Sequence, residues 1–126
     1  MNGTKTIHII ENNPSIADVL RIALEDVGYS VFAVDNMDEA RTKAQIQPPD
    51  LVLLDLDMNI QYGIEYVNWL KNVRRARIPM VLMGYDDETR RLARSLGADG
   101  WLHMPFNIDD LIELVNRLIT QGDDER

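Results

Sequence analysis

The feature that most constrains this chain is an alternation, repeated five times, between short apolar runs and segments with apolar residues at helical spacing. Short runs of β-branched and apolar residues predict strands, and the spacing i, i+3, i+4 predicts amphipathic helices. The expected strands are residues 6–10, 29–34, 51–54, 78–83 and 100–103. The expected helices are residues 14–27, 36–46, a segment after Gly63, 87–96 and 107–120. Strands and helices in this order predict one parallel sheet with right-handed crossovers and helices on both faces.

The length of 126 residues favours a single domain. We expect its core over residues 6–120 and a polar tail at 121–126. The apolar runs are far shorter than the ~20 residues of a membrane helix, so we expect a soluble protein. The absence of cysteine agrees with a cytoplasmic location. The net charge of −8 disfavours direct binding of nucleic acid, because such binding depends on neutralising phosphates.

Acidic residues follow the expected strands at the edge where parallel sheets bind ligands. Glu11 follows the first strand, Asp55 follows the third, and Asp57 lies two residues further on. In a sheet of order 2-1-3-4-5 the first and third strands are neighbours, so Glu11 and Asp55 would face each other. Carboxylates this close repel unless a proton or cation lies between them, which favours a hard ion such as Mg²⁺. An Asp beside such an ion is also a candidate nucleophile toward phosphorus.

Four segments, in order, resemble the receiver domain of bacterial response regulators. They are IIENNP at residues 9–14, PDLVLLDLDM at 49–58, IPMVLMG at 78–84 and GADGWLHMPF at 97–106. The resemblance extends from about residue 6 to 120 and implies an α/β fold: a (βα)5 flavodoxin-like three-layer sandwich of sheet order 2-1-3-4-5. It also implies phosphorelay signalling, in which a histidine kinase or phosphotransfer protein delivers a phosphoryl group to Asp55. A cis peptide between Met104 and Pro105 is expected on the same basis.

The metal ligands implied by the resemblance are only partly retained. Glu11, Asp55 and the backbone carbonyl of Asp57 match ligand positions, whereas Asn12 stands where the family usually has a second acid. Because one negative charge is missing, we expect Mg²⁺ to bind weakly.

The three positions that sense the phosphoryl group in the family also differ. Gly84 stands in place of Thr or Ser, Met104 in place of Lys, and Trp101 at the aromatic switch position. A hydrogen bond to a charged group contributes ~1.5–3 kcal/mol, so losing two donors weakens the phosphorylated state. We therefore expect an atypical receiver, weakly phosphorylated or independent of phosphorylation, whose only catalysis would be Mg²⁺-dependent self-phosphorylation. Restoring Asp at 12, Thr at 84 and Lys at 104 is expected to recover phosphorylation in part.

The resemblance also implies a partner surface, formed by the fourth helix, the fifth strand and the fifth helix. An output domain, another partner protein or a second copy of the chain would bind there. Opposite charges on the two helices suit a two-fold dimer, because a two-fold axis pairs them reciprocally. The residues concerned are Arg90, Arg91 and Arg94 on one helix and Asp109, Asp110 and Glu113 on the other.

Two other interpretations of the polar residues were weighed. Asp55 and Asp57 also resemble the nucleophile and acid pair of haloacid-dehalogenase-type phosphatases, although those enzymes place the pair on the first strand. His8 and His103 lie on the first and fifth strands. Since those strands are not adjacent in the expected sheet, we predict that the two histidines do not form a metal site.

Overall fold

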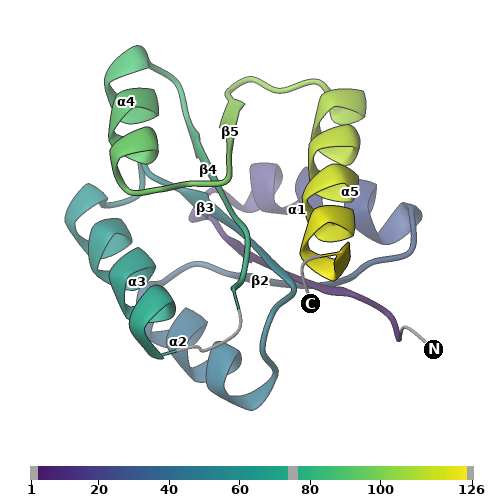
Figure 1. The fold of residues 1–126 in the computed structure, drawn as a ribbon. Helices are drawn as coiled ribbons and strands as arrows, with labels where there is room; N and C mark the ends of the chain where they lie inside the picture. The colour runs from purple at the N-terminus through teal and green to yellow at the C-terminus, as the bar shows by residue number, and fades with distance from the viewer. Residues whose placement is uncertain (1–2, 74–76, 125–126) are drawn as a thin grey trace.

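The computed structural model describes residues 3–73 and 77–124, which form a parallel sheet with helices on both faces (Figure 1). The strands are β1 (Thr6–Ile10), β2 (Ser30–Val34), β3 (Leu51–Asp55), β4 (Met80–Gly84) and β5 (Gly100–His103). The helices are α1 (Pro14–Asp26), α2 (Met37–Ile46), α3 (Ile60–Val73), α4 (Asp87–Ser95) and α5 (Ile108–Asp124). The strand order β2-β1-β3-β4-β5 confirms the predicted topology.

Apolar side chains on the central strands alternate between two cores, one on each face of the sheet. On β3, Leu51 and Leu53 pack in the cluster that includes α1 and α5, whereas Val52 and Leu54 pack in the cluster that includes α2, α3 and α4. All four side chains are fully buried. A strand covered on both faces must be apolar at every position, which explains the continuous apolar run in the sequence.

Two aspartates at the edge of the sheet where the strands begin hold neighbouring strands in register. Asp50 accepts a hydrogen bond from the Thr6 N–H at 2.8 Å, and Asp99 accepts one from the Met80 N–H at 2.9 Å. The first bond ties β3 to β1, and the second ties the start of β5 to β4. The carboxyl ends of the same strands are therefore aligned at the other edge.

Asparagine side chains cap four helices at their amino ends. The side chains of Asn13, Asn36 and Asn107 accept backbone N–H groups of the first helical turn. Asn59 caps the fourth of these helices by accepting from the Tyr62 N–H at 3.1 Å. The expectation that this helix starts after Gly63 was wrong, because the cap starts α3 at residue 60.

The predicted tail at residues 121–126 was also wrong in part, since α5 continues to Asp124; residues 125–126 lie outside the described part. Gly28 and Gly97 follow α1 and α4 with φ of +103° and +79°, the left-handed conformation that ends a helix. Gly122 does not adopt a positive φ, so the backbone hydrogen bonds of α5 continue through it. Polar residues extend a helix as long as each N–H reaches the carbonyl four residues earlier.

One face of α1 is less buried than its spacing predicts. Val19 and Val27, which have helical spacing with the core residues of α1, are 46% and 48% exposed. Together with Ile22 and Ile108 they line a groove of about 940 Å³ between α1 and α5. In the part of the chain that the structure describes, no helix has the length and apolar character needed to cross a membrane.

Candidate functional site

Glu11 and Asp55 lie side by side at the carboxyl edge of the sheet, as predicted. Ile10 of β1 pairs with Leu54 of β3, so the residues that follow them are neighbours. Both carboxyl groups are buried, with exposures of 4% for Glu11 and 8% for Asp55. The Asp57 N–H donates to Asp55 Oδ1 at 2.8 Å, which orients the Asp55 carboxylate.

The second oxygen of Glu11 has no partner at this edge. Glu11 Oε1 accepts from the Asn13 N–H at 3.2 Å, whereas the buried Oε2 makes no hydrogen bond. Burial, reinforced by the adjacent Asp55 carboxylate, raises the pKa of Glu11 to about 8. Burial and the charges of Asp55 and Asp86 also raise the pKa of Asp57. Without a cation, Glu11 is therefore mainly protonated at pH 7, because the surroundings do not stabilise a second negative charge beside Asp55.

This donor set fits a hard divalent cation. Two buried carboxylates, one of them with an unpartnered oxygen, are the ligand type that Mg²⁺ prefers. Within the described ranges, however, no group of three or more His, Cys, Asp or Glu side chains is placed to hold a metal. A cation here would depend on two acidic side chains, supplemented by neutral oxygens.

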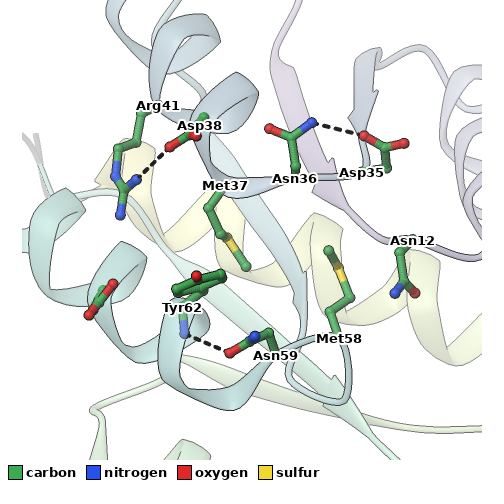
Figure 2. A pocket seen from close by; sticks show the side chains of 10 residues that line it. Asn12, Asp35, Asn36, Met37, Asp38, Arg41, Met58, Asn59 and Tyr62 are labelled. Atoms are coloured by element: carbon green, nitrogen blue, oxygen red, sulfur yellow. Dashed lines mark hydrogen bonds and ion pairs between the residues drawn. The ribbon is translucent and has the colours of Figure 1, made fainter.

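Asn12, at the position of the missing acid, is exposed. Its side chain lines a pocket of about 430 Å³ between the starts of α2 and α3. Figure 2 shows Asn12 beside Met58 and Asn59, with the Arg41–Asp38 ion pair at the far end of the pocket. An amide contributes no charge to the acidic edge, so the structure offers no replacement for a second acid from this loop.

On the other side of Asp55, apolar side chains pack closely at the ends of β4 and β5, where the family resemblance predicts polar ones. Met104 is 5% exposed and belongs to the same core cluster as Met83 and Leu111. Its N–H donates to the Gly84 carbonyl at 2.8 Å, and the Met104–Pro105 peptide is cis, as predicted. The side chain at the position of the expected lysine is thus a core residue.

Trp101 fills the space above Gly84. A Cβ atom added to Gly84 would lie 2.6 Å from Trp101 Cη2 and 2.7 Å from Thr89 Oγ1. In the triple variant with Asn12→Asp and Met104→Lys, the Gly84→Thr change therefore needs both Trp101 and Thr89 to move. The sequence analysis did not identify Thr89 as part of this site. The spacing of Asp86 and Thr89 is that of a helix cap and could have indicated it. In the structure Asp86 accepts a hydrogen bond from the Thr89 N–H at 2.8 Å.

The residues of the expected partner surface are all exposed. Arg90, Asp110 and Glu113 line one pocket of about 540 Å³, which Trp101 also borders. Asp109 lines the groove between α1 and α5, and Glu113 borders this groove as well.

The two histidines are far apart, as predicted, because β3 and β4 separate their strands. His103 is exposed, whereas His8 is buried edge-to-face against Phe32 at 5.7 Å between ring centroids. Burial lowers the pKa of His8 to about 4, so this side chain is neutral at pH 7.

Comparison with known proteins identifies the family of this chain. The family model of the response regulator receiver domain matches residues 7–116. The transcriptional regulatory protein KdpE of Staphylococcus aureus is 31% identical over 89% of this chain and 50% of its own length. The KDP operon transcriptional regulatory protein KdpE of Escherichia coli is 33% identical over 82% of this chain and 46% of its own. The chain spans about half the length of these curated relatives.

Solved structures of receiver proteins have the same fold as this chain. The chemotaxis protein CheY4 of Vibrio cholerae superposes with a TM-score of 0.81 at 25% identity, covering 92% of this chain and 99% of that one. A CheY-like receiver domain from Methanospirillum hungatei gives a TM-score of 0.87 at 22% identity over 98% of this chain and 100% of the other.

The chain therefore belongs to the response regulator receiver domain family and is a receiver domain of two-component signalling. Such domains are generally not enzymes. The alternative of a haloacid-dehalogenase-type phosphatase is not supported.

Proposed function

We propose that this receiver has Asp55 at the phospho-acceptor position but gains little from phosphorylation, and that it acts mainly by binding a partner protein. The observation that carries the proposal is the contrast around Asp55. Glu11 and Asp55 form a buried acidic pair, whereas the side chains expected to bind a phosphoryl group are replaced by Gly84 and the core residue Met104.

In this proposal Asp55 is the nucleophile, and two observations support that role. Its Oδ1 is held by the Asp57 N–H, and its register beside β1 sets it next to Glu11. Transfer from a phosphohistidine would break the N–P bond as a bond forms between phosphorus and an oxygen of Asp55. Receiver domains generally bind Mg²⁺ at this site, where the ion neutralises phosphoryl oxygens; here Glu11, Asp55, the Asp57 carbonyl and the Asn12 amide oxygen would hold it.

The product of that transfer would be poorly stabilised. Phosphorylation replaces the singly charged carboxylate of Asp55 by a phosphoryl group with close to two negative charges, beside Glu11 and Asp57. Each missing donor to a charged group removes ~1.5–3 kcal/mol, and neither Gly84 nor Met104 has a donor in its side chain. A modification that interacts equally with two conformations of a protein does not shift the balance between them.

Intact mass spectrometry tests this proposal. The chain is incubated with acetyl phosphate and Mg²⁺ beside the matched variant Asp55→Asn. We expect no stable adduct on either protein, no stable complex with beryllium fluoride, and weak Mg²⁺ binding to the unaltered chain. Near-complete phosphorylation that is lost in Asp55→Asn would contradict the proposal.

The partner surface is proposed at α4, β5 and α5, where Arg90 and Asp110 share a pocket. A partner could be an output domain, another protein or a second copy of the chain. For the dimer, sedimentation at low salt is the measurement. Arg90→Glu should favour the monomer, and adding Asp110→Arg should restore the dimer, because a two-fold axis pairs the two charges reciprocally. A chain that is monomeric at high concentration and low salt would exclude the dimer.

The relatives suggest how such a domain is used. MtrA of Mycolicibacterium smegmatis, 28% identical over 94% of this chain, is a DNA-binding response regulator. We propose that any role of this receiver at DNA is indirect, because its net charge of −8 opposes contact with phosphates. A fluorescence-anisotropy titration with duplex DNA at low salt should show no binding by this domain.

A further inference from the structure

The feature that carries a further inference is the contact between Trp101 and Gly84. In the register of the sheet, Trp101 pairs with Leu82 and Gly84 pairs with His103. Trp101 is half-buried and packs against the core cluster that contains Leu82, and Gly84, two residues after Leu82, faces the same side of β4. An aromatic ring can reach a diagonal neighbour on the adjacent strand, and here the far edge of the indole lies over Gly84.

Space, not backbone conformation, requires glycine at position 84. Gly84 does not adopt a positive φ, so its backbone suits any residue. A Cβ atom there would lie 2.6 Å from Trp101 Cη2. The missing side chain at 84 and the large one at 101 are therefore two halves of one packing arrangement.

The opposite wall of this space is held firmly. Thr89 is 5% exposed, and its Oγ1 donates to Asp86, whose carbonyl and Oδ1 lie at 3.0 and 2.9 Å. Asp86 Oδ1 also accepts the Thr89 N–H at 2.8 Å. Because these bonds fix the rotamer of Thr89, its hydroxyl cannot readily turn away from an added Cβ, which would lie 2.7 Å from it.

We propose that Gly84 is a socket for the Trp101 ring, and that this pair locks β5 to the end of β4 and the start of α4 in one arrangement. Buried Nε1 of Trp101 has no hydrogen-bond partner, so packing rather than a polar contact holds the ring. The same ring borders the pocket of Arg90 and Asp110. The lock therefore makes the shape of that surface independent of the chemistry at Asp55.

The lock does not rest on the proposed function, because its tests use neither a phosphoryl donor nor a partner. The first test measures how much Gly84→Ala destabilises the folded chain in four backgrounds: the unaltered chain, Trp101→Ala, Thr89→Ala, and both together. In the unaltered chain we expect the unfolding equilibrium constant to rise by a factor of about 10–100, the usual effect of overpacking. In the double background we expect a change of less than about threefold, because both close contacts are gone.

Gly122→Ala is the matched control, since nothing lies within 4 Å of the added methyl. It should not destabilise the chain in any background. A cost of Gly84→Ala that is equal in all four backgrounds would overturn the proposal.

The second test needs no destabilised background. In a Trp69→Phe variant, Trp101 is the remaining tryptophan, and its fluorescence reports its surroundings. We expect emission at short wavelength and weak quenching by acrylamide. Adding Gly84→Ala should move the emission to longer wavelength and increase quenching several-fold, because the ring is displaced toward solvent. Trp101 emission that is already strongly quenched with Gly84 present, or that does not respond to Gly84→Ala, would overturn the lock.

Discussion

The two sides of Asp55 differ in kind. Toward β1, the edge of the sheet is acidic: Glu11 is buried, and one of its oxygens has no partner. Toward β5, the edge is packed: Trp101 covers Gly84, and Met104 is part of the core. The acidic side resembles a site that a cation or phosphoryl group would complete, whereas the packed side resembles the interior of any stable domain.

Under the proposed function, this difference separates accepting a phosphoryl group from responding to it. The acidic side opposes folding, because burial of two adjacent carboxyl groups raises the pKa of Glu11. The packed side favours folding, because it buries apolar surface at a place where a receiver usually has polar groups. On this proposal the chain keeps the acceptor, but its output does not depend on phosphorylation of that acceptor.

The largest expected effect comes from rebuilding the packed side. In a Thr89→Ala background, which removes the hydroxyl that would lie 2.7 Å from an added Cβ, a variant with Asn12→Asp, Gly84→Thr, Trp101→Tyr and Met104→Lys is made. It restores the acid and both donors and replaces the indole with a smaller ring. We expect phosphorylation by acetyl phosphate to be faster by a factor of at least ~10², the smallest contribution of a single donor to developing charge. Intact mass spectrometry over time gives the rate.

Two controls accompany this experiment. The same four changes on Asp55→Asn should give no adduct. The three changes without Trp101→Tyr should give a less stable protein, because the Thr side chain at 84 then meets the indole. If the three-change variant is as stable and as reactive as the four-change variant, the packed side is not a barrier.

Much of the fold and of the acidic side could be predicted from the sequence. Residues close together in the chain determine the strands and the helix caps at Asn13 and Asn36. The pairing of Glu11 with Asp55 depends only on the strand order, which the alternating pattern predicts. The Trp101–Gly84 contact was not predictable, because it depends on a register between strands and on a rotamer. The exposure of Val19 is not predictable for a similar reason: helical spacing defines a face of the helix but not how far the neighbouring helix covers that face.

The next effect concerns the acidic side and pH. Because the pKa of Glu11 is raised to about 8 from 4.5, the folded chain holds a proton that the unfolded chain releases over this range. Without metal, the free energy of unfolding should therefore fall as pH rises from 5 to 8, by on the order of 3 kcal/mol. Urea denaturation in a chelating buffer measures this fall. In Glu11→Gln, which cannot ionise, the fall should be much smaller; an equal slope in both proteins would place its origin elsewhere.

A smaller effect is expected from Met104→Lys alone. Met104 is 5% exposed, so an ammonium group placed there must either be buried or extend along the protein surface to the acidic side. We expect a loss of about 2 kcal/mol in the free energy of unfolding, and a smaller loss for Met104→Leu, which remains apolar. A Met104→Lys protein as stable as the Leu variant would show that the packed side tolerates charge, and the two sides would then differ less than the structure indicates.

The smallest effect tests whether the two sides are independent. Asn59 caps α3 directly after the acidic loop, so Asn59→Ala should cost about 1 kcal/mol, while Asn59→Asp keeps the cap and should cost less. Since Asn59 lies on the acidic side, neither variant should change acrylamide quenching of Trp101 in the Trp69→Phe background. Thr89→Ala removes a wall of the Gly84 socket and should increase that quenching. If Asn59→Ala also increases it, the two sides are coupled through the sheet, and the packed side does respond to changes near Asp55.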